Sequence, residues 1–434
     1  MDQPDQAPEG APAPSGIRPS RRALLGMLGA GAAGLAGGGL AGAAIASAAA
    51  AGTAGGATTS TVAFHGAHQA GIVTPAQDRL HFASFQLVRG TTRDDLIELL
   101  REWTAAAEPL TRGEALGTGL EPDNALLPPD DTGEAEGLHA GRLTITFGFG
   151  RELFVGDDGD SDPFGLRAQL PAEFAPLPAF AFDLLEQAQS GGALCVQACA
   201  DDPQVAVHAI RNLARIAVGR AHLSWSQLGF GRTASTSREQ ETPRNLFGFK
   251  DGTMNIMSDE SAALSDFVWV GNEGPEWMRG GTYLVARKIM MTIETWDRAS
   301  LGEQERIIGR TKRTGAPVTG GDEFSQPKLG LRGEDGEPVM DMAAHVRLAH
   351  PKNNDGARML RRGYNYVDGS NNLGQMGAGL FFISFQNDPE IFVRVQRSLK
   401  PDLMGEYIRH IGSGLWAVPR GVAKGEFLGQ ALFG

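Results

Sequence analysis

The chain has 434 residues, a formal net charge of −12 at pH 7 and an isoelectric point near 5.3. This acidic balance argues against a nucleic-acid-binding surface, which needs clustered positive charge. Hydrophobic residues make up 41% of the sequence, which is enough for an ordinary packed core. The length suits one large or two medium domains once an N-terminal signal is removed.

The first 60 residues have the pattern of an export signal followed by a linker. Arg21 and Arg22 precede an apolar run, rich in alanine and glycine, that continues to about Ala51. Residues 46–48, Ala-Ser-Ala, match a signal peptidase site, which predicts cleavage near Ala48. A transmembrane anchor is the alternative, but small residues make a poor membrane segment. We therefore predict export by the Tat pathway to an extracellular, cell-envelope or periplasmic location, with no membrane span kept after cleavage.

Strand and helix patterns alternate through residues 61–240. A helix is indicated over residues 92–108, because its leucines and Trp103 fall on one face. The segment 110–140 is rich in glycine, proline and acidic residues and predicts a loop, as does the segment around residues 157–160. The remaining predicted elements are strands at 81–88, 143–148 and 193–200 and a helix at 203–218. This order suits a ferredoxin-like unit with an antiparallel sheet.

The two cysteines of the chain, Cys195 and Cys199, fall in the predicted buried strand 193–200. Two residues four apart on a strand lie about 13 Å apart, which is too far for a disulfide. We therefore predict two free, buried thiols. The absence of a Cys-x-x-Cys-His sequence excludes a haem that is covalently attached through that motif.

The segment 241–434 repeats the same pattern more loosely. Strands are predicted at 282–293 and 379–386, and helices at 296–308, capped near Thr295, and at 389–398. Between them, residues 309–375 form a long, polar, glycine-bearing stretch. Loops of that length inside a compact domain usually carry function.

One acidic residue stands between glycines in the second half. Residues 248–255, Gly-Phe-Lys-Asp-Gly-Thr-Met-Asn, place Asp251 in a sharp turn with Asn255 four residues on. An ordinary Asp-Gly turn is the alternative interpretation. A second cluster follows about ninety residues later, with His345 in an apolar stretch and the pair Arg361-Arg362 shortly after it.

Together these motifs resemble the dye-decolourising peroxidases, and the pattern looks closest to their Tat-exported bacterial branch. The resemblance runs from about Phe64 to the C-terminus. It implies an α+β protein of two ferredoxin-like domains, each an antiparallel sheet with helices packed on it, over residues 61–240 and 241–434. It also implies one haem b per chain, held mainly by the second domain.

The implied reaction is H2O2-dependent oxidation of dyes or other bulky aromatic reductants through a ferryl intermediate. One alternative is a haem-binding protein or deferrochelatase that serves iron or haem handling. Another is an interaction protein without haem. A homo-oligomer is compatible with the resemblance. Electrons from a bulky reductant could be relayed by tryptophan or tyrosine, and the resemblance does not rank the candidates, which are Trp269, Trp277, Trp296, Trp416, Tyr364 and Tyr407.

The resemblance assigns the distal chemistry to three side chains. Asp251 would take a proton from hydrogen peroxide and return it to the outer oxygen, so that water leaves. Arg361 would stabilise the developing negative charge. Asn255 would orient the peroxide or a relay water.

On the other face of the haem, His345 matches the axial iron ligand, with His350 as its local competitor. His208 and His222 are expected to be core or surface histidines, whereas His65 and His68 stay open. The carboxylate behind His345 is predicted to be Glu406, with Asp388 as the second candidate. Arg362, Arg287 and Lys288 are candidates for the haem propionates, and Phe382 for packing on the distal face.

Overall fold

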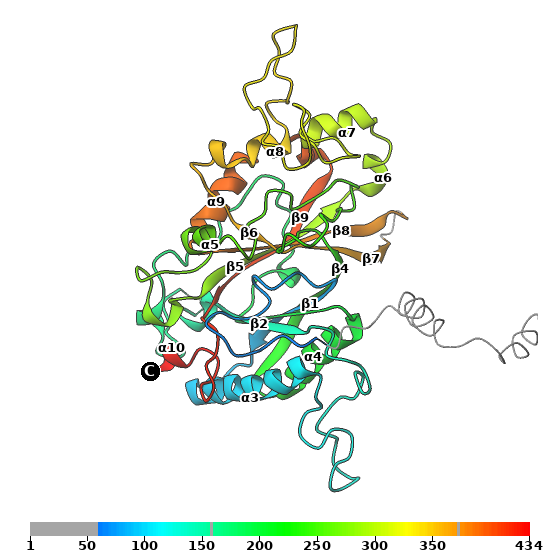
Figure 1. Ribbon diagram of the computed structural model, residues 1–434. Helices are drawn as coiled ribbons and strands as arrows, with labels where there is room; N and C mark the ends of the chain where they lie inside the picture. The colour runs from blue at the N-terminus through cyan, green and yellow to red at the C-terminus, as the bar shows by residue number, and fades with distance from the viewer. Residues whose placement is uncertain (1–59, 157–158, 371–373) are drawn as a thin grey trace, which may run out of the picture. The chain divides into compact units, whose positions relative to one another are not determined.

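A computed structural model describes residues 60–156, 159–370 and 374–434 (Figure 1). The predicted signal and linker therefore lie outside the described residues, apart from Ser60. Within the described part of the chain, no helix is long and apolar enough to cross a membrane.

The first half contains the predicted ferredoxin-like unit. Its elements are β1 Arg79–Leu87, α3 Arg93–Arg112, β2 Thr144–Gly150, β3 Leu194–Ala200, α4 Pro203–Ile216 and β4 Ala221–Arg232. The strands pair in the order β4-β1-β3-β2, all antiparallel. The two helices, α3 and α4, pack on each other and along one face of this sheet (Figure 1).

Local sequence explains why these helices start where they do. The Thr92 side chain accepts a hydrogen bond from the backbone of Asp95, whose own carboxylate accepts from Thr92, and this capping box begins α3. Asp202 caps α4, and Pro203 fits its first turn because no backbone donor is needed there. Trp103, predicted to face the core, is only 1% exposed.

The second half repeats the same order of strands. It contains β5 Thr282–Met291, β7 Tyr364–Ser370, β8 Met376–Gln386, α9 Pro389–Ser398 and β9 Ile408–Val418, paired antiparallel as β9-β5-β8-β7. The short strand β6 Leu360–Arg361 pairs with β8. Helix α9 packs on β5 and β8. The predicted fold class is thus confirmed.

The two sheets are continuous, because β2 pairs with β9 and β4 pairs with β7. Together with the pairing of β5 and β8, these contacts close eight strands into a ring. One buried cluster, which includes Phe82, Phe381 and Trp416 with ring centroids 5.2–5.4 Å from Phe82, draws its side chains from strands on both halves. The ring therefore shares one core, and the domain boundary at residues 240 and 241 stays a prediction.

Cys195 and Cys199 are free and buried in this core, as predicted. The predicted helix over residues 296–308 is wrong. The chain instead forms α6 Ile293–Trp296 and then α7 Leu301–Ile308, because Ser300 caps a new helix by accepting from the backbone of Glu303.

The remaining elements are short. They are α5 Ser261–Phe267, α8 His345–Leu348 and α10 Gln430–Phe433, and the 3-10 turns η1 Arg151–Leu153, η2 Arg167–Gln169, η3 Gln187–Gln189, η4 Glu276–Met278, η5 Pro351–Asn353 and η6 Leu403–Glu406. The long segment 309–375 holds α8, η5, β6 and β7, so it delivers both His345 and Arg361.

Candidate active site

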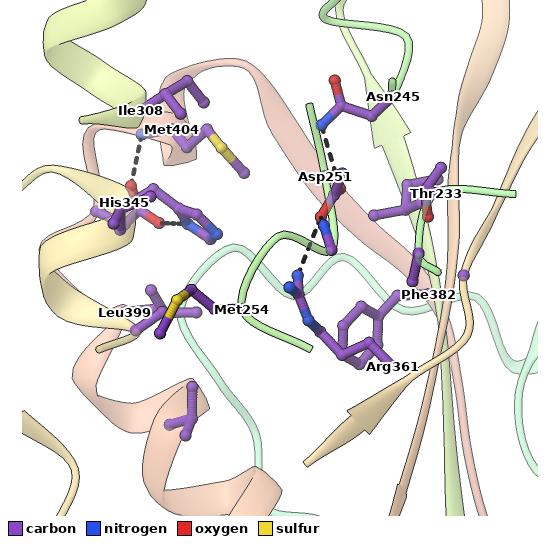
Figure 2. Close-up of a pocket in the computed structure, with 18 of the residues that line it drawn as sticks. Thr233, Asn245, Asp251, Met254, Ile308, His345, Arg361, Phe382, Leu399 and Met404 are labelled. Carbon is purple, nitrogen blue, oxygen red and sulfur yellow. Dashed lines mark hydrogen bonds and ion pairs between the residues drawn. The ribbon is translucent and has the colours of Figure 1, made fainter. Parts of the chain in front are cut away.

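A large cavity lies in the second half of the fold, bordered by β5, β8 and α9 and by the segments that carry Asp251 and His345. Its empty volume is about 1780 Å³, including the part that opens to solvent. Much of its wall is apolar, from residues such as Phe249, Leu380 and Phe392. Figure 2 shows His345 on one side of this space, pointing toward Asp251 and Arg361 on the other.

His345 is the first residue of α8, and its ring is held by a buried carboxylate. Its Nδ1 lies 2.6 Å from Oδ2 of Asp402, whose side chain is only 3% exposed. Asp402 is fixed in turn, because its Oδ1 accepts from the backbone N–H of Met404 and so caps η6. With Nδ1 occupied, Nε2 is the nitrogen that remains for a ligand in the cavity.

The charge of Asp402 also acts on the imidazole. Burial, the largest single influence, lowers the pKa of His345, but the attraction of Asp402, its hydrogen bond and the charge of Asp251 together outweigh burial and raise it. An imidazole beside a carboxylate is electron-rich, which is the property that an axial iron ligand uses.

The structure corrects the carboxylate predicted behind His345. Glu406 is exposed at the end of η6, and Asp388 caps α9 by accepting from the backbone of Glu390. Asp402 takes the position instead, four residues before Glu406. Its only local signal is an N-cap pattern, which many surface acids share, so the sequence could not single it out.

Across the cavity, Asp251 and Arg361 form an ion pair. Nη1 of Arg361 donates to Oδ1 of Asp251 at 3.0 Å, and the backbone N–H of Gly252 donates to the same oxygen at 2.8 Å. The side-chain amide of Asn245 donates to Oδ2 at 3.3 Å. The Asp251 and Arg361 side chains are 19% and 29% exposed, so both reach the cavity without being fully solvated. Asn245 was not predicted, and it has no sequence signal beyond its place in a turn.

The glycines that frame Asp251 are required by the backbone. Gly248 and Gly252 both have φ of +81°, which L side chains rarely adopt. A Cβ at Gly252 would also lie 2.7 Å from the Cα of Ala234, a backbone atom that cannot rotate away. The turn that aims Asp251 therefore depends on glycine, as the sequence indicated.

Asn255 does not reach the cavity, which corrects its predicted contact with peroxide. It is 3% exposed, and its amide is used entirely on backbone groups. Its Oδ1 accepts from the N–H of Arg361 at 2.7 Å, while its Nδ2 donates to the carbonyls of Arg361 and Ser235. Asn255 thus fixes the backbone from which the Arg361 side chain extends.

The predicted role of Arg362 at a haem propionate is also corrected. Neighbouring residues on an extended chain point to opposite faces, so Arg362 turns away from Arg361. It is fully buried and donates to the carbonyl of Thr74 and to Gln77, in the first half of the chain. Lys288 faces away from the cavity as well, where it pairs with Asp368 at 2.7 Å.

Arg287 and Phe382 do line the cavity. Arg287 is 1% exposed and is already paired with Asp183, His410 and Ser413. Figure 2 places Phe382 beside Arg361 on the wall opposite His345. His350 lines the cavity too, as does Arg310, which no sequence motif singles out.

Family models of the Dyp-type peroxidases match both halves of the chain. The N-terminal model covers residues 69–231 and the C-terminal model covers residues 242–423. The chain therefore belongs to the Dyp-type peroxidases, as the motifs indicated.

Individual relatives agree with this family. The chain is 36% identical over 422 residues to a protein of Escherichia coli named deferrochelatase, covering 95% of this chain and 97% of that protein. It is 40% identical to ferric DtpA from Streptomyces lividans, with a TM-score of 0.78 over 86% of this chain and 98% of that one. A DyP-type peroxidase from Cellulomonas bogoriensis is 37% identical, with a TM-score of 0.77 over 87% and 99% of the two chains.

Proposed function

We propose that this peroxidase binds one haem b in the cavity, with His345 as axial ligand, and uses H2O2 to oxidise dyes or other bulky aromatic reductants. One observation carries the proposal. The His345–Asp402 pair and the Asp251–Arg361 pair face each other across a single, mostly apolar cavity (Figure 2).

The residues that line the cavity fit a haem in their chemistry. Apolar side chains suit the faces of a porphyrin. The imidazole of His345 offers Nε2 on one side, and the opposite side carries an acid and a guanidinium. Nη2 of Arg310, buried in the cavity wall, has no hydrogen-bond partner among the described residues, as expected where an anionic ligand completes a site.

When bound, the haem supplies the iron that is oxidised by peroxide and then reduced by the donor. Asp251 accepts a proton from hydrogen peroxide through its carboxylate and returns it to the departing oxygen, so that water leaves. Arg361 stabilises the negative charge that develops as the O–O bond breaks, because its donors are already oriented in a site sheltered from water. Asn245 and the N–H of Gly252 keep the carboxylate in place.

Spectroscopy of the purified protein tests this function directly. A Soret band should be present, and H2O2 with a bulky dye should give sustained turnover. His345→Ala should lose most of the haem, because the one other cavity imidazole that a carboxylate holds among the described residues is His410, whose Nδ1 contacts both Asp183 and Arg287. His350→Ala is the matched control and should keep an axially ligated haem. If His345→Ala keeps the haem content and spectrum of the wild type, the axial assignment is wrong.

A second candidate function is release of iron from haem, favoured by the name of the relatives that are 36% identical over 95% of the chain. The two functions differ in their products. Peroxidase turnover leaves the haem intact, whereas iron release leaves a fluorescent, metal-free porphyrin. Porphyrin fluorescence that rises in step with released iron, without dye oxidation, would favour the second function.

We also propose that the protein is exported folded by the Tat pathway. The support is the sequence pattern of residues 20–51, a twin arginine followed by an apolar, alanine-rich run with a cleavage site.

A further inference from the structure

Among the described residues, four methionines line the cavity, and Met254 is the most exposed of them. The other three are Met291, Met359 and Met404. Met254 is 38% exposed, whereas Met291 is 2% exposed and the remaining two are half-buried. Methionine sulfur is open to oxidation where an oxidant can reach it, and Met254 can be reached both from solvent and from the cavity.

Met254 lies three residues after Asp251, in the turn that follows the acid. The backbone N–H of Asn255 donates to the carbonyl of Gly252 at 3.0 Å, and this bond closes the turn. Both ends of the turn are fixed, because Gly252 has a φ of +81° and Asn255 is buried and bonded to backbone groups. Figure 2 shows the Met254 side chain extending from this turn toward the side of the cavity where Leu399 lies. The backbone therefore directs the thioether into the same cavity that Asp251 faces.

A side-chain amide already faces this sulfur. Nε2 of Gln326, an exposed residue, lies 3.9 Å from Sδ of Met254, and the next residue, Pro327, lines the cavity. A thioether sulfur is only a weak acceptor, so this contact holds the two segments together weakly. Oxidation converts the apolar thioether into a polar sulfoxide, whose oxygen accepts hydrogen bonds. A sulfoxide at Met254 would therefore bind Gln326 and join the two segments where the cavity opens to solvent.

We propose that Met254 is a modification site, at which H2O2 oxidises the thioether to the sulfoxide. We also propose that the sulfoxide, bound to Gln326, narrows the opening of the cavity to bulky reductants. The inference rests on the proposed peroxidase function. It adds to that function how the enzyme is changed when peroxide is present without a reductant.

The reaction at Met254 is a transfer of one oxygen atom. One oxygen of H2O2 forms the S–O bond, the O–O bond breaks, and the other oxygen leaves as water with both protons. The sulfur is oxidised by two electrons and the peroxide is reduced by two. Asp251 moves the proton to the departing oxygen and Arg361 stabilises the charge that develops there, as in the reaction proposed above.

Mass spectrometry of the haem-loaded protein tests the site, with two other methionines as internal controls. Met342 and Met376 are 63% and 47% exposed and lie outside the cavity lining. If exposure alone decided, Met254 would be oxidised last of the three. When H2O2 is added without a reductant, Met254 should instead be oxidised first, roughly tenfold faster than Met342, because the peroxide is held beside it. In Asp251→Ala this advantage should disappear, while the two controls are oxidised as in the wild type.

The effect of the sulfoxide is measured after the peroxide has been removed and the Soret band has shown that the haem is kept. In the oxidised wild type, KM for a bulky anthraquinone dye should rise roughly 2- to 10-fold, the range for one hydrogen bond. KM for ferrocyanide, a small reductant, should stay the same, and methionine sulfoxide reductase should reverse the change. Met254→Leu, which keeps the volume of the side chain, should show no rise after peroxide treatment. Gln326→Ala should form the sulfoxide but keep its KM for the dye.

Two kinds of result would overturn the inference. The modification site is wrong if Met254 is oxidised no faster than Met342 and Met376, or equally fast in Asp251→Ala. The role at the opening is wrong if KM for the dye is unchanged in the oxidised wild type, or rises as much in Met254→Leu. Failure of the proposed function has a different signature, because the wild type would then show no Soret band and would oxidise neither reductant.

Discussion

The hydrogen bond between Asp402 and His345 gives a sharp test of how the site is built. Asp402→Asn keeps the size of the side chain and leaves an oxygen that can accept from the N–H of Met404, so η6 keeps its cap. It removes the negative charge 2.6 Å from Nδ1 of His345. The substitution therefore isolates the charge of the carboxylate from its structural role.

The expected magnitude follows from the geometry. A hydrogen bond to a charged group contributes about 1.5–3 kcal/mol, and Asp402 is almost fully buried, so solvent screening does not reduce it much. One factor of ten corresponds to about 1.4 kcal/mol, which predicts a loss of about 10- to 100-fold in haem affinity. The reduction potential of the iron should rise, because an amide leaves the imidazole less electron-rich.

Soret titration of the haem-free protein measures the affinity, and a redox titration of the loaded protein measures the potential. Glu406→Gln is the matched control. It makes the same chemical change four residues further on, at an exposed side chain, and should leave both quantities unchanged. Circular dichroism of the haem-free variants checks that the fold is kept. If Asp402→Asn behaves like Glu406→Gln, the carboxylate does not tune the axial ligand.

Three further predictions concern other parts of the chain. Asp251→Ala should slow the oxidation of the haem by peroxide about 10²- to 10⁴-fold, and Arg361→Leu should slow it about 10²- to 10³-fold. The double variant should lose less than the product of the two single losses, because both residues act on the same event. Stopped-flow rates equal to those of the wild type, with the haem retained, would contradict this site. Replacing Arg21 and Arg22 by lysine should keep the precursor in the cytoplasm, and exported mature protein beginning near Ala49 would refute the Tat signal. Burial lowers the pKa of His81 from 6.5 to about 4, so the unfolded chain binds the extra proton between these values and stability falls as the pH drops through that window. Between pH 7 and pH 5, the free energy of unfolding measured with denaturant should fall by about 2 kcal/mol more in the wild type than in His81→Leu. Equal falls in the two proteins would show that protonation of His81 does not cause the loss.

The sequence indicated those parts of the fold whose signals are local. The capping residue Thr92 and the leucine stripe after it predict α3, and Pro389 at the start of α9 marks that helix to the residue. The glycines around Asp251 indicated a turn that only glycine can make. The prediction of helices from sequence failed where a capping residue interrupted a helical pattern. Ser300 is such a residue, and it begins a new helix inside a segment that was predicted to be one continuous helix.

The sequence by itself therefore indicated the strands β1, β2, β3, β5 and β8, the family, and the candidates His345, Asp251 and Arg361, but it predicted no strand at β4, β6, β7 or β9. The tertiary structure decided which side chains meet. Asp402 is 57 residues from His345, and Arg361 is 110 residues from Asp251. All four residues belong to the second half of the chain, where β6, which carries Arg361, pairs with β8, and where η6, which Asp402 caps, directly precedes β9. Capping, periodicity and turn preferences act over a few residues, whereas these contacts are selected by the packing of the whole chain, so local sequence rules could not reveal Asp402.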